Sequence, residues 1–334
     1  MDILNRLTDK SRLEGLLNNV PSPETCTIDA VALEADLKAS VYGQDEVCRD
    51  VARQIKTRFA KETRKKPIGV FLLAGPPATG KTWFAKVLSK ALDKDKPLLH
   101  YDMTQFSQPH TVAQLFGQPK GYAGSDSYGK LTGDLRSTPK CVILLDEIEK
   151  AHPEVRTKFL TAWNDGFVTE ASNGAPVSTV NAIFVLTTNA AQRQITDLTK
   201  QYGDNRAELS RACAAALKDV FAPEFLSRID YVFPFVPLGN LDLARVVAHR
   251  LEEEVKEYGL EVDHIEADVL VRSVHLARAR EADPREIARQ IESQISEQII
   301  ELKEAGIKRL RIIDTGEGIA VEAAEPPPRS GKRI

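Results

Sequence analysis

The chain has 334 residues, 42% of them hydrophobic, which is long and apolar enough to fill the cores of two packed domains. A formal net charge of -3 argues against a surface built to neutralise the phosphates of nucleic acid, which needs clustered excess Lys and Arg. The 4 cysteines form no CxxC pair, and no signal-peptide core or window of membrane-spanning length occurs. We therefore expect a cytoplasmic protein that binds neither nucleic acid nor a membrane.

The first 30 residues combine an amphipathic segment with a linker. Apolar residues recur at helical spacing over residues 1–20, and the segment ends before the proline-containing stretch VPSPET. We expect this helix to dock on the body of the protein or on a partner.

Between residues 31 and 237, short apolar runs alternate with helical stretches. The runs are IGVFLLA (68–74), PLLHYD (97–102), CVILLD (141–146) and AIFVLTT (182–188). Runs that are apolar at every position predict parallel strands buried on both faces, and therefore an α/β domain. The stretch YVFPFVP (231–237) predicts a closing strand, and Pro234 within it favours the edge of the sheet.

Helical patterns dominate after Pro237. The stretches LDLARVVAHRLEEEVKEYG and DPREIARQIESQISEQIIELKEAG predict helices, and RLRIID and GIAVEA are short strand candidates. We expect a smaller, mainly helical domain over residues 238–318 and a disordered tail over 319–334, whose end EPPPRSGKRI has no means of packing.

A phosphate-binding pattern follows the first predicted strand. GPPATGKT fits G-x-x-x-x-G-K-[ST] and opens the helix TWFAKVLSKAL, a context that a plain Gly-Pro turn does not require. Gly75 and Gly80 permit backbone angles that turn N–H groups inward, where the helix N-terminus also favours a polyphosphate. Lys81 is expected to reach the β- and γ-phosphates of ATP, and Thr82 to offer its hydroxyl to Mg²⁺. The predicted ATP-binding residues are Gly75, Pro76, Pro77, Ala78, Thr79, Gly80, Lys81 and Thr82.

Two adjacent carboxylates end the predicted strand CVILLD. Asp146 and Glu147 lie where open α/β sheets present their ligand sites. Asp146 suits Mg²⁺ coordination, mostly through water, while Glu147 points to a different spot and can take the proton from the water that attacks the γ-phosphate. Aliphatic residues before two acids are also typical of a strand that enters a solvated turn, but the upstream glycine loop favours ATP hydrolysis.

Seven stretches carry a family resemblance, in family order and at family spacing. They are VYGQDEV at 41, GPPATGKT at 75, GYAG at 121, ILLDEIEKAHPEV at 143, VLTTNA at 185, FAPEFLSRID at 221 and DPREIARQIE at 283. They resemble AAA+ ATPases, and more narrowly the second ATPase module of the Clp unfoldases and disaggregases. The resemblance covers residues 30 to 317. It implies a P-loop core whose parallel five-stranded sheet is flanked by helices, a smaller helical lid domain, and the use of ATP and Mg²⁺.

The resemblance implies roles for further positions. Val41 and Tyr42 match the segment that covers the adenine, and an apolar pair suits the face of a base. Asn189 matches the polar residue called sensor 1, which helps to orient the lytic water, although an Asn that simply ends a strand is a common feature. Arg228 in FLSRID matches the arginine finger, which reaches the γ-phosphate held by the neighbouring subunit. A site completed in trans requires a ring, so the resemblance implies a homo-oligomer, a hexamer.

Two departures from the family pattern concern coupling. Where the family has Gly-Ala-Arg at sensor 2, this chain has Asp283, Pro284 and Arg285, so the helix start is retained but a carboxylate lies near the cation meant for phosphate. The stretch ASNGAPVSTVNA (171–182) lacks two basic positions that the family carries in a hairpin beside the lower pore. We therefore expect weaker coupling to domain rotation and between subunits than in the family.

Tyr122 lies among glycines in KGYAGSDSYGKL, which matches the family's pore loop. There an aromatic side chain projects into the central channel and grips an extended polypeptide, and flanking glycines let the loop move. Without the resemblance, a glycine-rich surface loop that happens to contain a tyrosine would be the simpler interpretation.

Two features of the family are missing from the chain. It carries one ATPase module with about forty residues ahead of it, so recruitment of a protein substrate is left to the N-terminal segment, the channel or an adaptor. The stretch AAQRQITDLTKQYGDNRAELSRA contains no Ile-Gly-Phe or Ile-Gly-Leu tripeptide, so no partnership with the Clp peptidase is expected.

The sequence predicts an ATP-hydrolysing machine that remodels proteins by pulling a polypeptide through a ring pore. One alternative is an AAA+ nucleic-acid motor or loader, which the acidic balance and the aromatic loop disfavour, since the basic run KETRKKP (61–67) is more simply a solvated helix end. Another is a nucleotide-gated assembly protein with little turnover. Against it stand the intact residues Lys81, Asp146, Glu147, Asn189 and Arg228.

Overall fold

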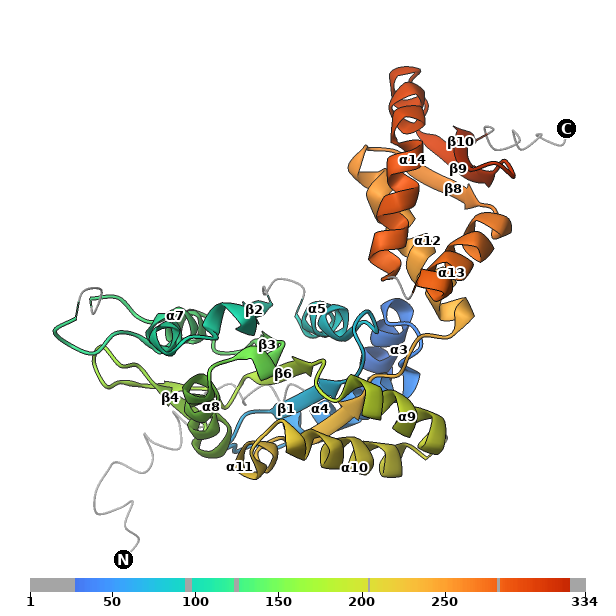
Figure 1. The fold of residues 1–334 in the computed structure, drawn as a ribbon. Helices are drawn as coiled ribbons and strands as arrows, with labels where there is room; N and C mark the ends of the chain where they lie inside the picture. Colours follow the sequence, from blue (N-terminus) through green and yellow to red (C-terminus); the bar gives the residue numbers. More distant parts are fainter. Residues whose placement is uncertain (1–27, 94–97, 123–125, 204, 281–282, 325–334) are drawn as a thin grey trace, which may run out of the picture.

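A computed structural model of the chain describes residues 28–93, 98–122, 126–203, 205–280 and 283–324. The predicted amphipathic helix over residues 1–20 and the end of the chain from residue 325 lie outside these ranges. The described part forms a larger lobe around one sheet and a smaller lobe that meets it at one corner, near α3 Ala30–Ser40 (Figure 1).

The larger lobe is built on a five-stranded parallel sheet, which confirms the predicted fold class. Its strand order is β2-β3-β6-β1-β7. The strands are β1 Gly69–Ala74, β2 Leu99–Asp102, β3 Val142–Asp146, β6 Ile183–Thr188 and β7 Tyr231–Pro234. Pro234 therefore lies on an edge strand, as predicted, where a missing N–H removes no ladder hydrogen bond.

Both faces of this sheet are buried, because successive side chains of a strand point to opposite faces. Val70 and Leu72 of β1 pack into one apolar cluster, and Phe71 and Leu73 pack into another. One face is covered by α3 Ala30–Ser40, α4 Asp45–Phe59 and α5 Lys81–Leu92. The other is covered by α6 Val112–Phe116, α7 Lys130–Ser137, α8 Pro153–Asp165, α9 Gln192–Tyr202, α10 Arg206–Ala216 and α11 Pro223–Leu226.

A short antiparallel hairpin follows α8 in the chain. It consists of β4 Phe167–Thr169 and β5 Pro176–Ser178, and it lies at the same end of the lobe as the loop between α6 and α7 (Figure 1). Single 3₁₀ turns cover Met103–Phe106, Pro109–Thr111, Ile148–Lys150 and Leu217–Asp219.

The smaller lobe has an apolar cluster of its own, drawn from residues 238–321. Its elements are α12 Asn240–Glu257, β8 Glu261–Ile265, α13 Ala267–Arg280, α14 Pro284–Glu304, β9 Arg309–Asp314 and β10 Ile319–Ala323. The predicted helices α12 and α14 and strands β9 and β10 are present, whereas β8 and α13 were not predicted. Because β10 pairs antiparallel with β9, the start of the tail at residue 319 is wrong.

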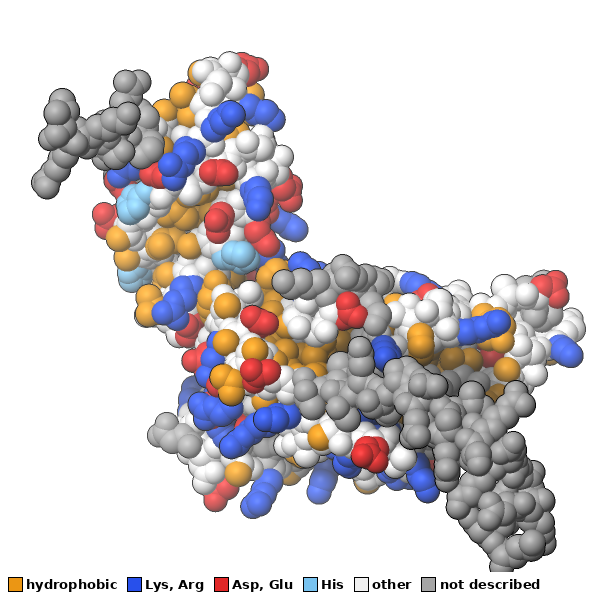
Figure 2. Space-filling model, turned by 180° about the vertical axis from the view of Figure 1, so that it is seen from behind, with side chains coloured by type: hydrophobic (Ala, Val, Ile, Leu, Met, Phe, Trp, Pro, Cys, Tyr) orange, Lys and Arg blue, Asp and Glu red, His pale blue; other side chains and the backbone are white. Residues whose placement is uncertain are grey.

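Apolar side chains gather on the smaller lobe and where the two lobes meet, on the face that Figure 2 shows. In the described ranges, no helix combines the length and the apolar character that a membrane span needs.

Candidate nucleotide site

The predicted phosphate loop joins β1 to α5 in a strained, closely packed turn. Ala78 and Gly80 have left-handed φ angles of 61° and 94°. Gly75 does not have a left-handed φ angle, so it is not needed for the backbone angle that the sequence predicted. Instead, a Cβ on Gly75 would lie 2.2 Å from the carbonyl oxygen of Phe235. Glycine is required there by close packing against the segment after β7, and left-handed backbone is rare enough in Ala78 to mark a functional turn.

Lys81 begins α5, and its side chain is buried at 6% exposure. Its Nζ donates hydrogen bonds to the carbonyl oxygens of Gly75 (2.9 Å) and Pro76 (2.7 Å). Among the described residues it forms no ion pair. Burial lowers the pKa of Lys81 to about 8, against the opposing effect of Glu149, Asp146 and Glu147. A buried ammonium held only by carbonyl groups suits an anionic ligand such as a polyphosphate.

ATP binding is expected to weaken above about pH 8. The lowered pKa means that Lys81 loses its charge as the pH rises through that value, so binding must then take up a proton. The Kd should rise by less than about twofold from pH 7.3 to 8 and then by up to about tenfold per pH unit. Titration of a fluorescent ATP analogue from pH 7.3 to 9.5 measures this, with Lys81→Ala as the control that removes the pH dependence. A parent Kd that stays flat to pH 9.5 would contradict the prediction.

Asp146 ends β3 beside the first turn of α5. Its carboxylate accepts hydrogen bonds from the hydroxyls of Thr82 (3.0 Å) and Thr187 (2.5 Å). Nε2 of His100 lies 3.3 Å from Oδ2 of Asp146. Thr82 and Asp146 together present a hydroxyl and a carboxylate, which are the hard oxygen ligands that Mg²⁺ prefers when waters complete its shell. No cluster of three or more His, Cys, Asp or Glu that could hold a metal occurs in the ranges described.

Glu147 adopts a left-handed backbone conformation, with φ 56°. Its N–H donates to Oγ1 of Thr187 (2.9 Å), and its Oε1 accepts from Nδ2 of Asn189 (2.8 Å). The left-handed turn sends the Glu147 carboxylate away from that of Asp146, so that the adjacent acids face different partners. Asn189 therefore contacts Glu147, the carboxylate predicted to act as the general base.

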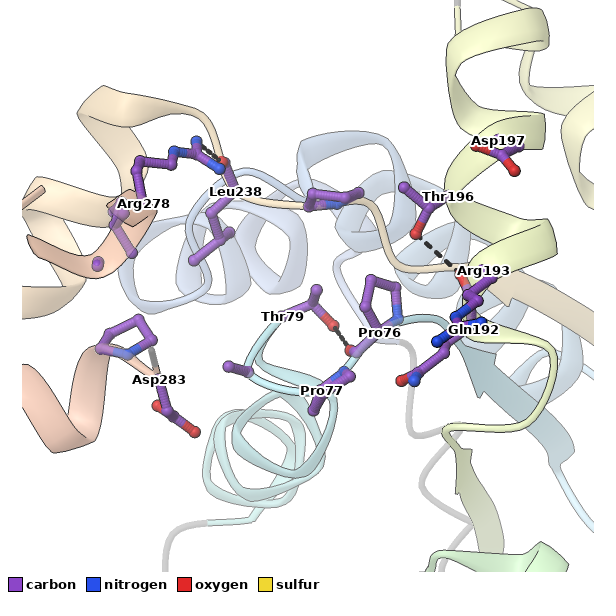
Figure 3. A pocket seen from close by; sticks show the side chains of 15 residues that line it. Pro76, Pro77, Thr79, Gln192, Arg193, Thr196, Asp197, Leu238, Arg278 and Asp283 are labelled. Carbon is purple, nitrogen blue, oxygen red and sulfur yellow. Dashed lines mark hydrogen bonds between the residues drawn. The ribbon is translucent and has the colours of Figure 1, made fainter. Parts of the chain in front are cut away.

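Two cavities flank the phosphate loop. The larger, about 910 Å³, is lined by the loop, by α9 and by the smaller lobe. Figure 3 shows Pro76, Pro77 and Thr79 between Gln192 and Arg193 of α9 on one side and Asp283 on the other. The smaller cavity, about 60 Å³, is lined by Val41 and Tyr42, the pair predicted to cover the adenine, and by Trp83, His249, Arg250 and Arg285.

Arg285 lies in the first turn of α14. Pro284 occupies the first turn and Asp283 is the N-cap, whose Oδ1 accepts from the N–H of Arg285 (2.8 Å). The Asp283 carboxylate is therefore used to cap the helix. The side chain of Arg285 is exposed and lines the smaller cavity. Asp283 also lines both cavities, so its charge stays close to any ligand of the phosphate loop.

The structure does not bring Arg228 or Tyr122 to this site. Arg228 lies before β7, and Gly75 lies after β1, which runs parallel to β7. Since Asp230 pairs with Val70, the two residues are separated by the length of the sheet, roughly 20 Å. Nε of Arg228 is buried without a partner among the described residues. Tyr122 is 68% exposed on the loop between α6 and α7.

Four residues of the site were missed by the sequence analysis. Gln44 is fully buried and ties the phosphate loop to Val236, and Trp83 donates its indole N–H to the carbonyl oxygen of Ser40 (2.8 Å). Thr187 and His100 contact Asp146. Gln44 lies within the stretch VYGQDEV and Thr187 within VLTTNA, so both had a signal, whereas Trp83 and His100 lie outside the seven stretches.

The fold and the site define a P-loop α/β domain with an acid pair beside the loop and a helical second lobe. The chain belongs to the AAA family: the profile of the AAA domain (Cdc48 subfamily) matches residues 66–232. It therefore carries an ATPase domain that binds nucleotide, as predicted.

The chain is similar to several Clp proteins. It is 36% identical to chaperone protein ClpB 2 of Parasynechococcus marenigrum over 87% of this chain and 33% of that protein. It is 38% identical to chaperone protein ClpB of Chlamydia muridarum over 65% of this chain and 25% of that protein. It is 36% identical to the ATP-dependent Clp protease ATP-binding subunit ClpE of Lactococcus lactis over 70% of this chain and 31% of that protein. The chain thus matches about a quarter to a third of the length of these relatives.

Proposed function

We propose that this protein is an ATP-driven remodelling machine that threads a polypeptide through the pore of a homo-hexameric ring. The observation that carries the proposal is Tyr122, a large aromatic side chain that is 68% exposed on a loop remote from the nucleotide site. An exposed tyrosine offers broad apolar contact at low rotamer cost and does not require a particular sequence in its ligand. The similarity to Clp chaperones supports this use of the loop.

In the proposed mechanism, the phosphate loop and Lys81 hold the β- and γ-phosphates, and Val41 and Tyr42 cover the base. Thr82 and Asp146 would hold Mg²⁺, which neutralises charge on the phosphates when it is bound. Glu147 takes the proton from the attacking water, and Asn189 fixes the carboxylate through its 2.8 Å hydrogen bond. Arg285 contacts the nucleotide from the smaller lobe, at the cavity that it shares with Tyr42.

Arg228 would complete the site of a neighbouring subunit. Its position at the opposite end of the sheet from the phosphate loop prevents it from acting on its own nucleotide. A residue that must act on another copy requires head-to-tail contacts, and such contacts form a ring when the rotation between subunits closes. The unpartnered Nε of Arg228 is consistent with an anion supplied from outside its own lobe.

We further propose that the Clp peptidase is not a partner and that an adaptor or the N-terminal segment recruits the protein substrate. The stretch that carries the docking tripeptide in peptidase partners contains none here. Most of that stretch lies within α9 and α10, which leaves only residues 203–205 between the helices. So short a connection supports the proposal, because docking by a tripeptide needs a protruding loop.

Tyr122→Ala is expected to keep basal ATPase activity within about twofold and to lose at least about 90% of remodelling, because it removes only the grip. ATP turnover and unfolding of a tagged fluorescent protein measure the two effects. Unfolded casein should stimulate the ATPase of the parent, whereas single-stranded DNA should not. Remodelling by Tyr122→Ala at the parent's rate would refute the threading function, and stimulation by DNA alone would favour a nucleic-acid motor.

A further inference from the structure

The two ends of the loop that carries Tyr122 meet at one point. A Cβ on Gly129 would lie 2.2 Å from the backbone nitrogen of Gly117, so these glycines are in direct contact. The described residues 118–122 leave the body and residues 126–128 return to it at the same place. Whatever holds Gly117 and Gly129 therefore sets the position of Tyr122.

Glu170, which follows β4 in the hairpin, contacts both ends of this loop. Its side chain is completely buried. Oε2 accepts hydrogen bonds from the N–H of Gly129 (3.0 Å) and from the hydroxyl of Thr132, and Oε1 accepts from the N–H of Ser172 (2.9 Å). A Cβ on Gly117 would lie 1.7 Å from Oε1, so the carboxylate also packs against the start of the loop.

Only neutral groups hold this carboxylate. Glu170 forms no ion pair with any residue in the described ranges. Burial works to raise the pKa of Glu170, but the hydrogen bonds from Thr132, Ser172 and Gly129 together outweigh it and leave the pKa below its ordinary value. A charge buried at this cost is retained only where its hydrogen bonds hold a specific arrangement.

Two further contacts join the loop to the hairpin. The N–H of Ala171 donates to the carbonyl oxygen of Phe116 (2.8 Å), directly before the loop. Nδ2 of Asn173, at the hairpin tip, donates to the hydroxyl of Tyr128 (3.0 Å), whose ring lies 4.9 Å from the guanidinium carbon of Arg136. Loop and hairpin project from the same end of the larger lobe (Figure 1).

We propose that Glu170 is a positioning residue for the polypeptide grip: its carboxylate fastens both ends of the Tyr122 loop to the β4–β5 hairpin, so that loop and hairpin move as one body. The proposal rests on the proposed threading function. Motion of α8, which leads directly into β4, then reaches Tyr122 through Glu170. Without the carboxylate, Tyr122 is still present, but its loop is joined to the hairpin only by the weaker contacts of Ala171 with Phe116 and of Asn173 with Tyr128.

The test compares Glu170→Gln with Asp165→Asn, which neutralises an exposed carboxylate at the end of α8 that accepts a hydrogen bond from its neighbour Asn164. Glu170→Gln keeps the side-chain shape but replaces one acceptor oxygen with an NH₂ group. The casein concentration that half-maximally stimulates the ATPase should rise about tenfold, the effect of losing one hydrogen bond to a charged group. Basal kcat and the KM for ATP should stay within about twofold, because no nucleotide contact changes. Asp165→Asn should match the parent.

Thr132→Val removes one donor to the same carboxylate and is expected to shift casein stimulation in the same direction. Hydrogen exchange should speed up at the amides of Gly129 and Ser172 in Glu170→Gln and stay unchanged in the phosphate loop. Parent-like casein stimulation by Glu170→Gln, in a protein in which Tyr122→Ala abolishes remodelling, overturns the role of Glu170 and leaves the threading function standing. A loss of basal ATPase in step with stimulation also overturns it, since that is the mark of general destabilisation.

Discussion

Glu147→Gln is expected to lower the rate of ATP hydrolysis by at least about a hundredfold while ATP binding stays within about threefold of the parent. The amide has the shape of the carboxylate and keeps an oxygen that can accept from Asn189, so the site is preserved. It cannot take a proton from the attacking water, so the chemical step loses its base. Single-turnover hydrolysis and titration of a fluorescent ATP analogue separate the two effects.

Glu154→Gln is the matched control, since Glu154 is an exposed acid in the first turn of α8, away from the site. It should hydrolyse ATP at the parent's rate. Parent-like turnover by Glu147→Gln would instead assign the proton to another group. If the threading function is correct, the Glu147→Gln ring should also retain bound polypeptide, so the proteins that co-purify with it would identify the substrate.

Arg228→Ala is expected to lower kcat by about a thousandfold at unchanged ATP affinity, because a guanidinium at the γ-phosphate neutralises charge that develops only in the transition state. The separation of Arg228 from the phosphate loop of its own chain predicts that this loss can be complemented between subunits. Arg228→Ala subunits keep an intact nucleotide site, and Glu147→Gln subunits keep an intact Arg228.

Mixing the two inactive variants in equal amounts tests the ring directly. Random assembly places an intact nucleotide site next to an intact Arg228 at about one interface in four, so the mixture should recover about a quarter of the parent activity. Arg228→Lys keeps the charge but not the forked geometry, and it should recover little. A mixture that assembles and stays inactive, or an Arg228→Ala protein with parent activity, would exclude action in trans.

The strands of the sheet could be predicted because each is an uninterrupted apolar run, a local property of the chain. Strand β8 of the smaller lobe could not be predicted in this way. Three of the five residues of its sequence EVDHI are exposed and two are acidic, and it forms a strand only because β9, more than forty residues later, supplies parallel hydrogen bonds. Helix α13 was missed in the same part of the chain. The tail was predicted to begin at residue 319, inside the strand candidate GIAVEA, and this boundary is wrong because β10 pairs with β9.

The sequence by itself determined the chemistry that is encoded by neighbours in the chain: the loop from Gly75 to Thr82, the acid pair Asp146 and Glu147, and the glycine-flanked Tyr122. Only the tertiary structure decided which distant groups surround them. Thr187 and His100 reach Asp146 because β2, β3 and β6 are adjacent in the sheet, an order that no local pattern specifies. Glu170 reaches both ends of the Tyr122 loop because the hairpin packs beside it. Short-range geometry follows from residue type and spacing, whereas strand order and the partners of a buried carboxylate follow from packing between segments far apart in the chain.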